Sequence, residues 1–306
     1  MARQLRFVAS TLPNVGWPEL LERYRHIEAL GFDIAGVPDH FVDWNTPRTS
    51  WFEAWTLLAA LARETTRIRL ATLVTQISFR NPALLARQSL TVDHISQGRL
   101  ELGLGIGLMI DPAYQMMGLP NWSAGERVSR FKEYVEIVHR LLSNEITTYE
   151  GRFYRVDGAI MSPPPVQRPR PPILIAAMGP RMLKLAARFA DNWNSTNPAD
   201  SFDEQLAETR DHIKLIDEEC TAIGRDPASL RRSFWMFDPR ARLHGGLFRY
   251  YESTEIFAEM AQRLIDLGIS EIGVYYPMRA EQLPMFERIA REIMPELKRK
   301  YGSGAS

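Results

Sequence analysis

Short apolar runs alternate with longer amphipathic segments along most of the chain. The runs are rich in β-branched and aromatic residues, and between them apolar positions recur at helical spacing. The runs predict strands at residues 5–10, 33–39, 68–75, 99–105, 172–177, 192–195, 230–237 and 271–276. The amphipathic segments predict helices at residues 18–30, 51–63, 82–98, 124–142, 181–190, 202–223, 254–267 and 282–294.

The alternation amounts to eight strand–helix units. Such units imply parallel strands, because a crossover helix returns the chain to the same end of the sheet. Eight units in 306 residues fit an α/β fold in which one (β/α)8 TIM barrel closes on itself. An open doubly wound sheet is the alternative, since periodicity alone does not detect closure. We interpret residues 1–306 as a single barrel domain with insertions.

Two segments interrupt the alternation. Residues 143–172 contain ITTYEGRFYRV, which predicts a small hairpin, and PPPVQRPRPP, which predicts a stiff approach to the fifth strand. Residues 238–253 follow the seventh strand, at the end of the barrel where TIM-barrel enzymes place their chemistry. This rim loop is long and contains the pair Gly245-Gly246. We therefore expect it to act as a lid whose aromatic residues exclude water.

Composition and charge narrow the range of functions. Lys+Arg and Asp+Glu both number 37, and this balance argues against binding to nucleic acid or to an acidic membrane surface. No apolar run approaches the roughly 20 residues of a membrane helix, and the first residues lack the pattern of a signal peptide. A single cysteine, Cys220, excludes a disulfide framework and a multi-cysteine metal site. We expect a cytoplasmic enzyme.

In a parallel barrel the residues that follow the strands meet at one rim, so we expect the chemistry there. These positions hold His40 beside Asp39, several glycines and many large apolar side chains. They lack the paired carboxylates of a glycosidase, a metal-binding cluster and a lysine for a Schiff base. An apolar mouth with one histidine suits a large planar cofactor and a small-molecule substrate, without a metal. We expect five rim residues to line the substrate pocket: Gln76, Met109, Trp235, Phe237 and Tyr275.

Three features of this rim allow both a functional and a structural interpretation. GLGIG at 103–107 is close to a dinucleotide fingerprint but lacks its third glycine, so a strand-to-loop turn explains it equally well. Gly179 and Pro180 open a helix directly after a strand, where free N–H groups attract phosphate; a simple helix start is the alternative. His40 is either a proton-transfer group at a cofactor ring or a structural partner of Asp39.

Four segments resemble a known family. They are PDHF at 38–41, the run over 69–107, GRFYRV at 151–156 and the run over 163–195. Together they are similar to the bacterial luciferase-like flavin monooxygenase superfamily, whose members are (β/α)8 barrels that use FMN or the deazaflavin coenzyme F420. PDHFVDW resembles an element of the F420-dependent branch. The resemblance therefore implies F420 as the cofactor, with FMN as the alternative, and a homodimer.

The resemblance also implies roles for particular residues. His40 and Trp44 would border the reactive carbon of the deazaflavin as catalytic residues, and Asp39 would face the polar edge of its ring. Leu73 and Val74 would form a bulge behind the ring, often with a cis peptide in the family. The ring edge, tail and phosphate would be bound by Gly105, Ile106, Gly107, Ala177, Met178, Gly179 and Pro180.

Two departures from that branch affect the expected substrate. The F420-dependent dehydrogenases have a glutamate shortly after the strand-four glycines, where this sequence has Leu108 and Met109. Leu73 is also bulkier than the small residue usual at the bulge. We therefore expect hydride transfer to or from a small, largely apolar organic molecule rather than a sugar phosphate. The alternatives are an FMN-dependent monooxygenase that uses O2 and a non-catalytic flavin-binding barrel.

Overall fold

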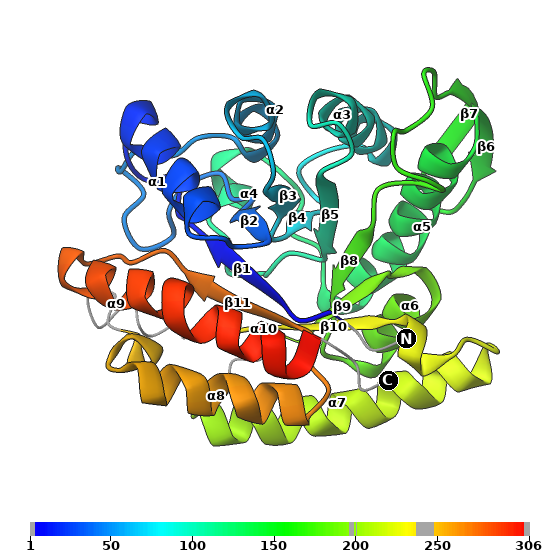
Figure 1. Cartoon of the computed structure of the whole chain (residues 1–306). Helices are drawn as coiled ribbons and strands as arrows, with labels where there is room; N and C mark the ends of the chain where they lie inside the picture. The colour runs from blue at the N-terminus through cyan, green and yellow to red at the C-terminus, as the bar shows by residue number, and fades with distance from the viewer. Residues whose placement is uncertain (1–3, 196–198, 200, 237–247, 303–306) are drawn as a thin grey trace.

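The computed structural model describes residues 4–195, 199, 201–236 and 248–302. In these residues eight parallel strands form a barrel (Figure 1). They pair in the order β3-β2-β1-β11-β10-β9-β8-β5, and β3 pairs with β5, which closes the ring. The (β/α)8 barrel is confirmed, and the open sheet is excluded. The strands are β1 (Arg6–Ser10), β2 (Ile34–Val37), β3 (Arg69–Thr72), β5 (Leu100–Gly105), β8 (Ile173–Ala176), β9 (Asn192–Ser195), β10 (Arg231–Trp235) and β11 (Glu271–Tyr275).

The strands are apolar because both of their faces are covered. Every residue of β2, β5 and β9 is buried, as expected for parallel strands between a filled barrel and an outer layer of helices. The segment predicted as one strand at 68–75 is two, because β3 ends before a cis peptide bond between Leu73 and Val74. The short strand β4 (Thr75–Gln76) then continues along β5.

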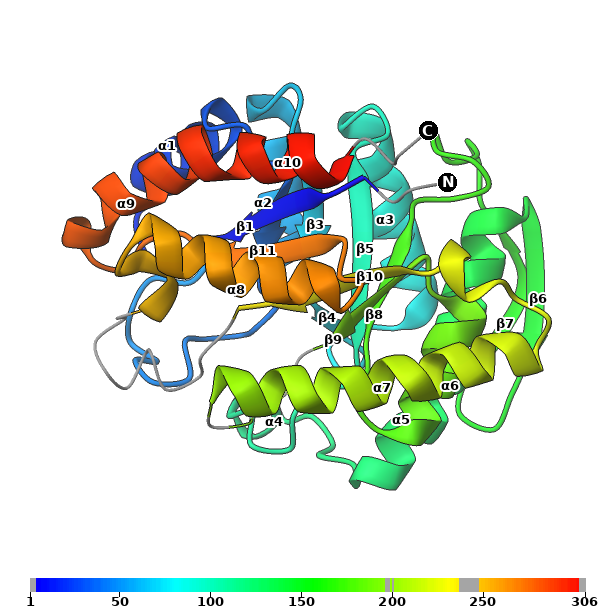
Figure 2. The same cartoon turned by 60° about the horizontal axis from the view of Figure 1, so that its bottom comes forward.

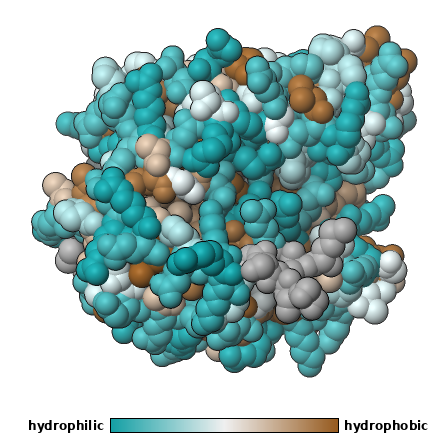
Figure 3. Space-filling view, viewed as in Figure 1, coloured by the Kyte–Doolittle hydropathy of each residue, from teal (hydrophilic) through white to brown (hydrophobic). Residues whose placement is uncertain are grey.

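The helices surround the barrel, as Figures 1 and 2 show from two directions. No helix in the described part of the chain is both long and apolar enough to span a membrane. Hydrophilic side chains predominate on the face in Figure 3, and apolar ones lie there in small groups. The helices are α1 (Trp17–Ala29), α2 (Ala54–Glu64), α3 (Pro82–Ile95), α4 (Ala113–Met116), α5 (Ala124–Ser143), α6 (Pro180–Phe189), α7 (Phe202–Ala222), α8 (Thr254–Asp266), α9 (Leu283–Arg288) and α10 (Met294–Gly302).

Local signals in the sequence explain where several helices begin. Asn81 caps α3 by accepting a hydrogen bond from the N–H of Ala83 at 2.8 Å, and Pro82 occupies the first turn. Ser201 and Glu204 form a reciprocal capping box at the start of α7. The helix predicted from residue 51 begins only at Ala54, since the carboxylate of Glu53 caps it. These caps satisfy N–H groups that have no partner within the helix.

Buried ion pairs occupy the amino-terminal end of the barrel. Glu101 of β5 accepts hydrogen bonds from Arg6 at 2.6 Å and from Arg69 at 2.5 Å. Arg6 also binds Glu271 of β11, which accepts a further hydrogen bond from Asn192 at 3.0 Å. Burial raises the pKa of Glu101, but the two arginines lower it more, so the net shift is downward. This network links five strands, β1, β3, β5, β9 and β11, at the end opposite the predicted catalytic rim.

The insertion at 143–172 contains the predicted hairpin. Strands β6 (Ile146–Glu150) and β7 (Arg155–Ile160) pair antiparallel and stand outside the barrel beside α5 (Figure 1). Glu133 of α5 fixes their connection, because its carboxylate accepts hydrogen bonds from the backbone of Arg152, Phe153 and Tyr154 at 2.9–3.2 Å. The hairpin is therefore fastened to a helix of the barrel.

The C-terminal part differs from the sequence-based expectation. The helix predicted at 282–294 extends to Gly302, with a π-helical turn at Ile289–Ile293 between α9 and α10. Most of the predicted lid, residues 238–247, lies outside the described residues. The aromatic residues at its end, which were expected to exclude water, are buried: Phe248 is 3%, Tyr250 3% and Tyr251 6% exposed. A short 3-10 turn (Arg249–Tyr251) brings them against the core, so they anchor the end of the loop.

Candidate active site

A cavity of about 370 Å³ opens at the carboxyl ends of the barrel strands. Residues at or directly after the end of each of the eight strands line it, from Ser10 at the end of β1 to Tyr275 at the end of β11. This convergence follows from closing parallel strands into a ring. The predicted site residues that line it are His40, Trp44, Leu73, Val74, Gln76, Gly105, Ile106, Gly107, Ala177, Met178, Gly179, Trp235 and Tyr275.

Asp39 does not line the cavity, contrary to the expectation that it faces a cofactor. Its side chain is buried, and both carboxylate oxygens bind the guanidinium of Arg80, one of them at 3.3 Å. Arg80 also donates to Glu53 at 3.1 Å. Burial lowers the pKa of Arg80, but Asp39, Tyr134 and Glu53 together raise it more, so the net shift is upward. A bidentate pair of this kind satisfies the carboxylate completely, which explains why Asp39 turns away from the cavity.

Two further predicted residues, Met109 and Pro180, do not line the cavity. Met109 is 53% exposed and is not among the lining residues, whereas its neighbour Leu108 is. Pro180 occupies the first turn of α6 behind the cavity wall. Phe237 falls outside the described residues. The substrate pocket predicted from the strand ends therefore loses Met109 and gains Leu108, because the chain turns outward directly after the glycines of β5.

His40 lies in the cavity next to a carboxylate that the sequence analysis missed. The Nδ1 atom of His40 is 3.4 Å from Oδ2 of Asp111, which is 3% exposed. Asp111 follows Gly107 by four residues, so the only signal was an acidic residue just beyond that rim segment. The predicted structural partner of His40, Asp39, is bound to Arg80 instead. The structure therefore replaces the Asp39–His40 pairing with Asp111–His40.

A chain of hydrogen bonds holds Asp111 in place. Its carboxylate accepts from Gln76 Nε2 at 2.8 Å and from the N–H of Ala113 at 2.9 Å. Gln76 in turn accepts from the hydroxyl of Tyr114 at 2.8 Å. Burial raises the pKa of Asp111, but the hydrogen bonds from His40, Ala113 and Gln76 lower it more. Asp111 is therefore a carboxylate at neutral pH, and both ends of the Gln76 amide are used within the protein.

Two tryptophans surround His40. The indole of Trp44 meets its ring edge-on, with centroids 4.8 Å apart, and Trp51 donates from Nε1 to the backbone carbonyl of His40 at 2.7 Å. Trp51 lines the cavity, whereas Trp55 is buried and bonds Thr75 at 3.1 Å. The Nε1 atom of Trp44 is buried and has no hydrogen-bond partner. Because an indole N–H only donates, a ligand group that pairs with it must be a hydrogen-bond acceptor.

Glycines let the walls of the cavity approach closely. A Cβ atom on Gly105 would lie 2.6 Å from Val74, and one on Gly36 would lie 1.8 Å from Leu73. A Cβ on Gly107, whose φ is +72°, would meet the side chain of Gln76 at 2.4 Å. Leu73, which is bulkier than the resemblance suggested, is thus accommodated by a glycine on the neighbouring strand.

Gly179 differs from these glycines because it borders open space. A Cβ atom built there meets no atom within 4 Å, and the residue both lines the cavity and caps the N-terminus of α6. N–H groups at the start of a helix attract anions through hydrogen bonds and the helix dipole. This part of the wall is suited to the phosphate of a cofactor. Cys220 is buried in α7.

Comparisons with known proteins agree with this fold. The family described as luciferase-like monooxygenase matches residues 5–237. The F420-dependent glucose-6-phosphate dehydrogenase of Intrasporangium calvum is 32% identical, with 93% of this chain and 99% of that protein aligned. The structure of the coenzyme F420-dependent tetrahydromethanopterin reductase from Methanopyrus kandleri has a TM-score of 0.78 at 18% identity, covering 96% of this chain and 99% of that one.

A monooxygenase from Streptomyces bottropensis has a TM-score of 0.75 at 24% identity, covering 96% of this chain and 100% of that one. Likeness at this level of identity supports the fold, while the family match and the Intrasporangium relative cover most of the chain. This chain belongs to the luciferase-like monooxygenase family, a family of enzymes.

Proposed function

We propose that this chain is a coenzyme F420-dependent oxidoreductase that transfers a hydride to or from a small organic substrate at the mouth of the barrel. The pair His40–Asp111, set in a cavity of glycines and large apolar side chains, carries the proposal. The similar proteins from Intrasporangium calvum and Methanopyrus kandleri are both named as F420-dependent, which supports the choice of cofactor.

The residues of the cavity fit such a cofactor. The buried N–H of Trp44 has no partner and would donate to an oxygen of the cofactor or substrate. The open N-terminus of α6 at Gly179 would hold the phosphate, and the wall at Val74 and Gly105 would border the ring. When bound, a deazaflavin supplies the two-electron chemistry by accepting or giving a hydride.

His40 would handle the proton that accompanies the hydride. A carboxylate accepts hydrogen bonds but does not donate them, so Asp111 would accept one from the Nδ1–H of the neutral imidazole. This leaves Nε2 as the acceptor, able to remove a proton from a substrate hydroxyl or to return it in the reverse direction. Asp111 then acts as a positioning residue that fixes the tautomer and stabilises the imidazolium.

The reacting part of the substrate would be apolar. Val42, Trp51, Leu108 and Met182 line the cavity around the polar pair, and both polar ends of Gln76 are already bonded. Excluding water from this region would strengthen the interactions of His40 with the substrate.

An FMN-dependent monooxygenase is the second candidate, favoured by the family description and by the monooxygenase from Streptomyces bottropensis. Titration of the purified protein with F420 and with FMN, followed by protein fluorescence, separates the two candidates. F420-dependent oxidation is then measured with a panel of secondary alcohols as loss of deazaflavin absorbance. Oxygen consumption with reduced FMN tests the alternative.

We expect F420 to bind more tightly than FMN, and alcohol-dependent F420 reduction to follow. His40→Ala should lower turnover about 10²- to 10⁴-fold, the range for proton-transfer groups, and Asp111→Asn about 10-fold with a changed pH profile. Gly179→Asp should abolish cofactor binding, because it adds a negative charge beside the phosphate site. His94→Ala, at an exposed histidine on α3, is the control. Failure to bind F420, or full activity of His40→Ala, would refute the proposal.

A further inference from the structure

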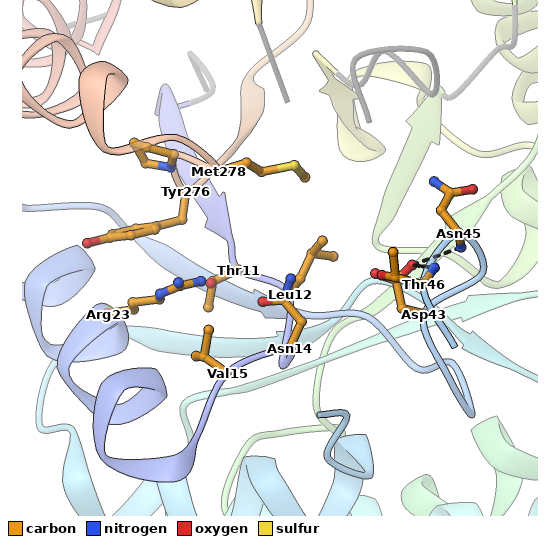
Figure 4. A pocket seen from close by; sticks show the side chains of 11 residues that line it. Thr11, Leu12, Asn14, Val15, Arg23, Asp43, Asn45, Thr46, Tyr276 and Met278 are labelled. Atoms are coloured by element: carbon orange, nitrogen blue, oxygen red, sulfur yellow. Dashed lines mark hydrogen bonds between the residues drawn. The ribbon is translucent and has the colours of Figure 1, made fainter. Parts of the chain in front are cut away.

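Figure 4 shows the side chains that line a second pocket, of about 220 Å³. Three loops at the carboxyl end of the barrel form it: 11–15 after β1, 43–46 after β2, and 276–278 after β11, with Arg23 of α1 completing the wall. Leu12 lines both pockets. The two pockets are therefore adjacent, with Leu12 in the wall of each, and nothing described so far uses the second.

Two buried polar atoms in the wall of this pocket have no hydrogen-bond partner. They are the hydroxyl oxygen of Thr11, a residue only 1% exposed, and Oδ1 of Asn14. Buried polar atoms in folded proteins nearly always have partners, so an unpartnered pair lining one pocket points to a missing ligand. Thr147 also has a buried unpartnered hydroxyl, but it lies on the β6–β7 hairpin and lines neither pocket.

The two atoms specify the chemistry of that ligand. Oδ1 of Asn14 only accepts hydrogen bonds, so the ligand must bring an O–H or N–H donor. The hydroxyl of Thr11 both donates and accepts. Phosphate dianions and carboxylates carry no donor and would leave Asn14 unsatisfied. A ligand group with hydroxyls, each of which donates and accepts, satisfies both residues at once.

The charges in the pocket also disfavour an anion. The guanidinium of Arg23 already binds Glu19 at 2.7 Å, and it lies 5.6 Å from the centre of the Tyr276 ring. Across the pocket, the carboxylate of Asp43 accepts from the N–H groups of Asn45 and Thr46 at 2.9 and 3.0 Å. The described lining thus combines a guanidinium paired with Glu19, a hydrogen-bonded carboxylate and an aromatic face, an environment suited to a neutral polar group.

We propose that this second pocket binds a neutral, hydroxyl-rich group of the substrate. The proposal rests on the proposed function, since the reacting carbon of the same molecule would lie near His40 in the main cavity. Leu12, shared by both pockets, would contact the middle of the molecule. The substrate is then amphipathic, with an apolar reacting end and a hydroxylated end, rather than apolar throughout.

Methyl-labelled protein, observed by NMR without any cofactor, tests the site directly. Methyl α-glucopyranoside serves as the neutral probe and inorganic phosphate as the anionic one. The neutral sugar should cause saturable shifts in the methyl signals of Leu12 and Val15, with phosphate weaker there. Thr11→Val and Asn14→Leu should each weaken binding about 3- to 10-fold, the effect of one hydrogen bond. Thr147→Val, which removes a comparable buried hydroxyl elsewhere, should leave binding unchanged.

Three results would overturn the inference: no saturable shift with the sugar, tighter binding of phosphate, or equal weakening by Thr147→Val. Two variants in different positions keep the test valid if one of them fails to fold. Titration with F420 on the same samples separates this site from the proposed function. Sugar binding without F420 binding refutes the cofactor proposal alone, and F420 binding without sugar binding refutes the second pocket alone.

Discussion

The contact between Gly36 and Leu73 leads to a quantitative prediction about the cavity wall. In Gly36→Ala, the new Cβ would lie 1.8 Å from Cδ1 and 2.9 Å from Cγ of Leu73, and 3.5 Å from Cβ of Ser10. Carbon atoms pack at roughly 3.5–4.0 Å, so Cδ1 of Leu73 must move by about 2 Å, which requires a different rotamer. Overpacking of this kind lowers the free energy of unfolding by about 1–3 kcal/mol.

The displaced side chain of Leu73 can move into the cavity, because Leu73 lines it. We therefore expect Gly36→Ala to weaken cofactor binding as well as stability. Urea unfolding measures the first effect on the free energy, and titration with F420 measures the second. Gly125→Ala is the matched control, since a Cβ there has its nearest neighbour at 4.0 Å.

The double variant Gly36→Ala with Leu73→Ala isolates the clash. Removing the end of the leucine vacates the space that the new methyl group needs, so the double variant should be more stable than the sum of the single changes predicts. We expect a coupling free energy of about 1–3 kcal/mol, as for residues in direct contact. Additive single effects, or a Gly36→Ala variant as stable as the natural chain, would show that this contact does not shape the wall.

Two further predictions concern the buried ion pairs. Arg80→Met should reduce the free energy of unfolding by about 3–5 kcal/mol, because it leaves the Asp39 carboxylate buried without its partner. Adding Asp39→Asn should recover part of this loss, and urea unfolding measures both variants. The pKa of Glu101 is lower in the native state than its ordinary value of 4.5. Its ionised form therefore stabilises the native state above pH 4.5, and this contribution disappears as the pH falls through the lower pKa of the native state. The difference in melting temperature between the natural chain and Glu101→Gln should therefore shrink below pH 4.5, and a constant difference would contradict the assignment.

Hydrophobic periodicity determined the architecture because it reports a local property. Whether a residue of α6 is buried depends on which side of the helix it occupies, and that spacing is visible in the sequence. A strand covered on both faces, such as β5, appears instead as a continuous apolar segment. The glycine, asparagine and serine residues that start the helices act over a few residues in the same way. The parallel strand–helix units follow from these local signals, and so does the position of His40, Gly105 and Gly179 at one end of the strands. The pairing of β3 with β5, which closes the barrel, is visible only in the tertiary structure.

The partners of the polar side chains were decided only by the tertiary structure. Asp39 and His40 are adjacent in sequence, yet one binds Arg80 and the other lies against Asp111, 71 positions away. These pairings depend on the angles at which separate loops leave the barrel, and those angles are not visible in the spacing of residues along the sequence. The same holds for Gly36 and Leu73, which meet because neighbouring strands pair in register. The chain thus encodes its elements locally, whereas the chemistry at the barrel mouth arises from contacts between distant segments.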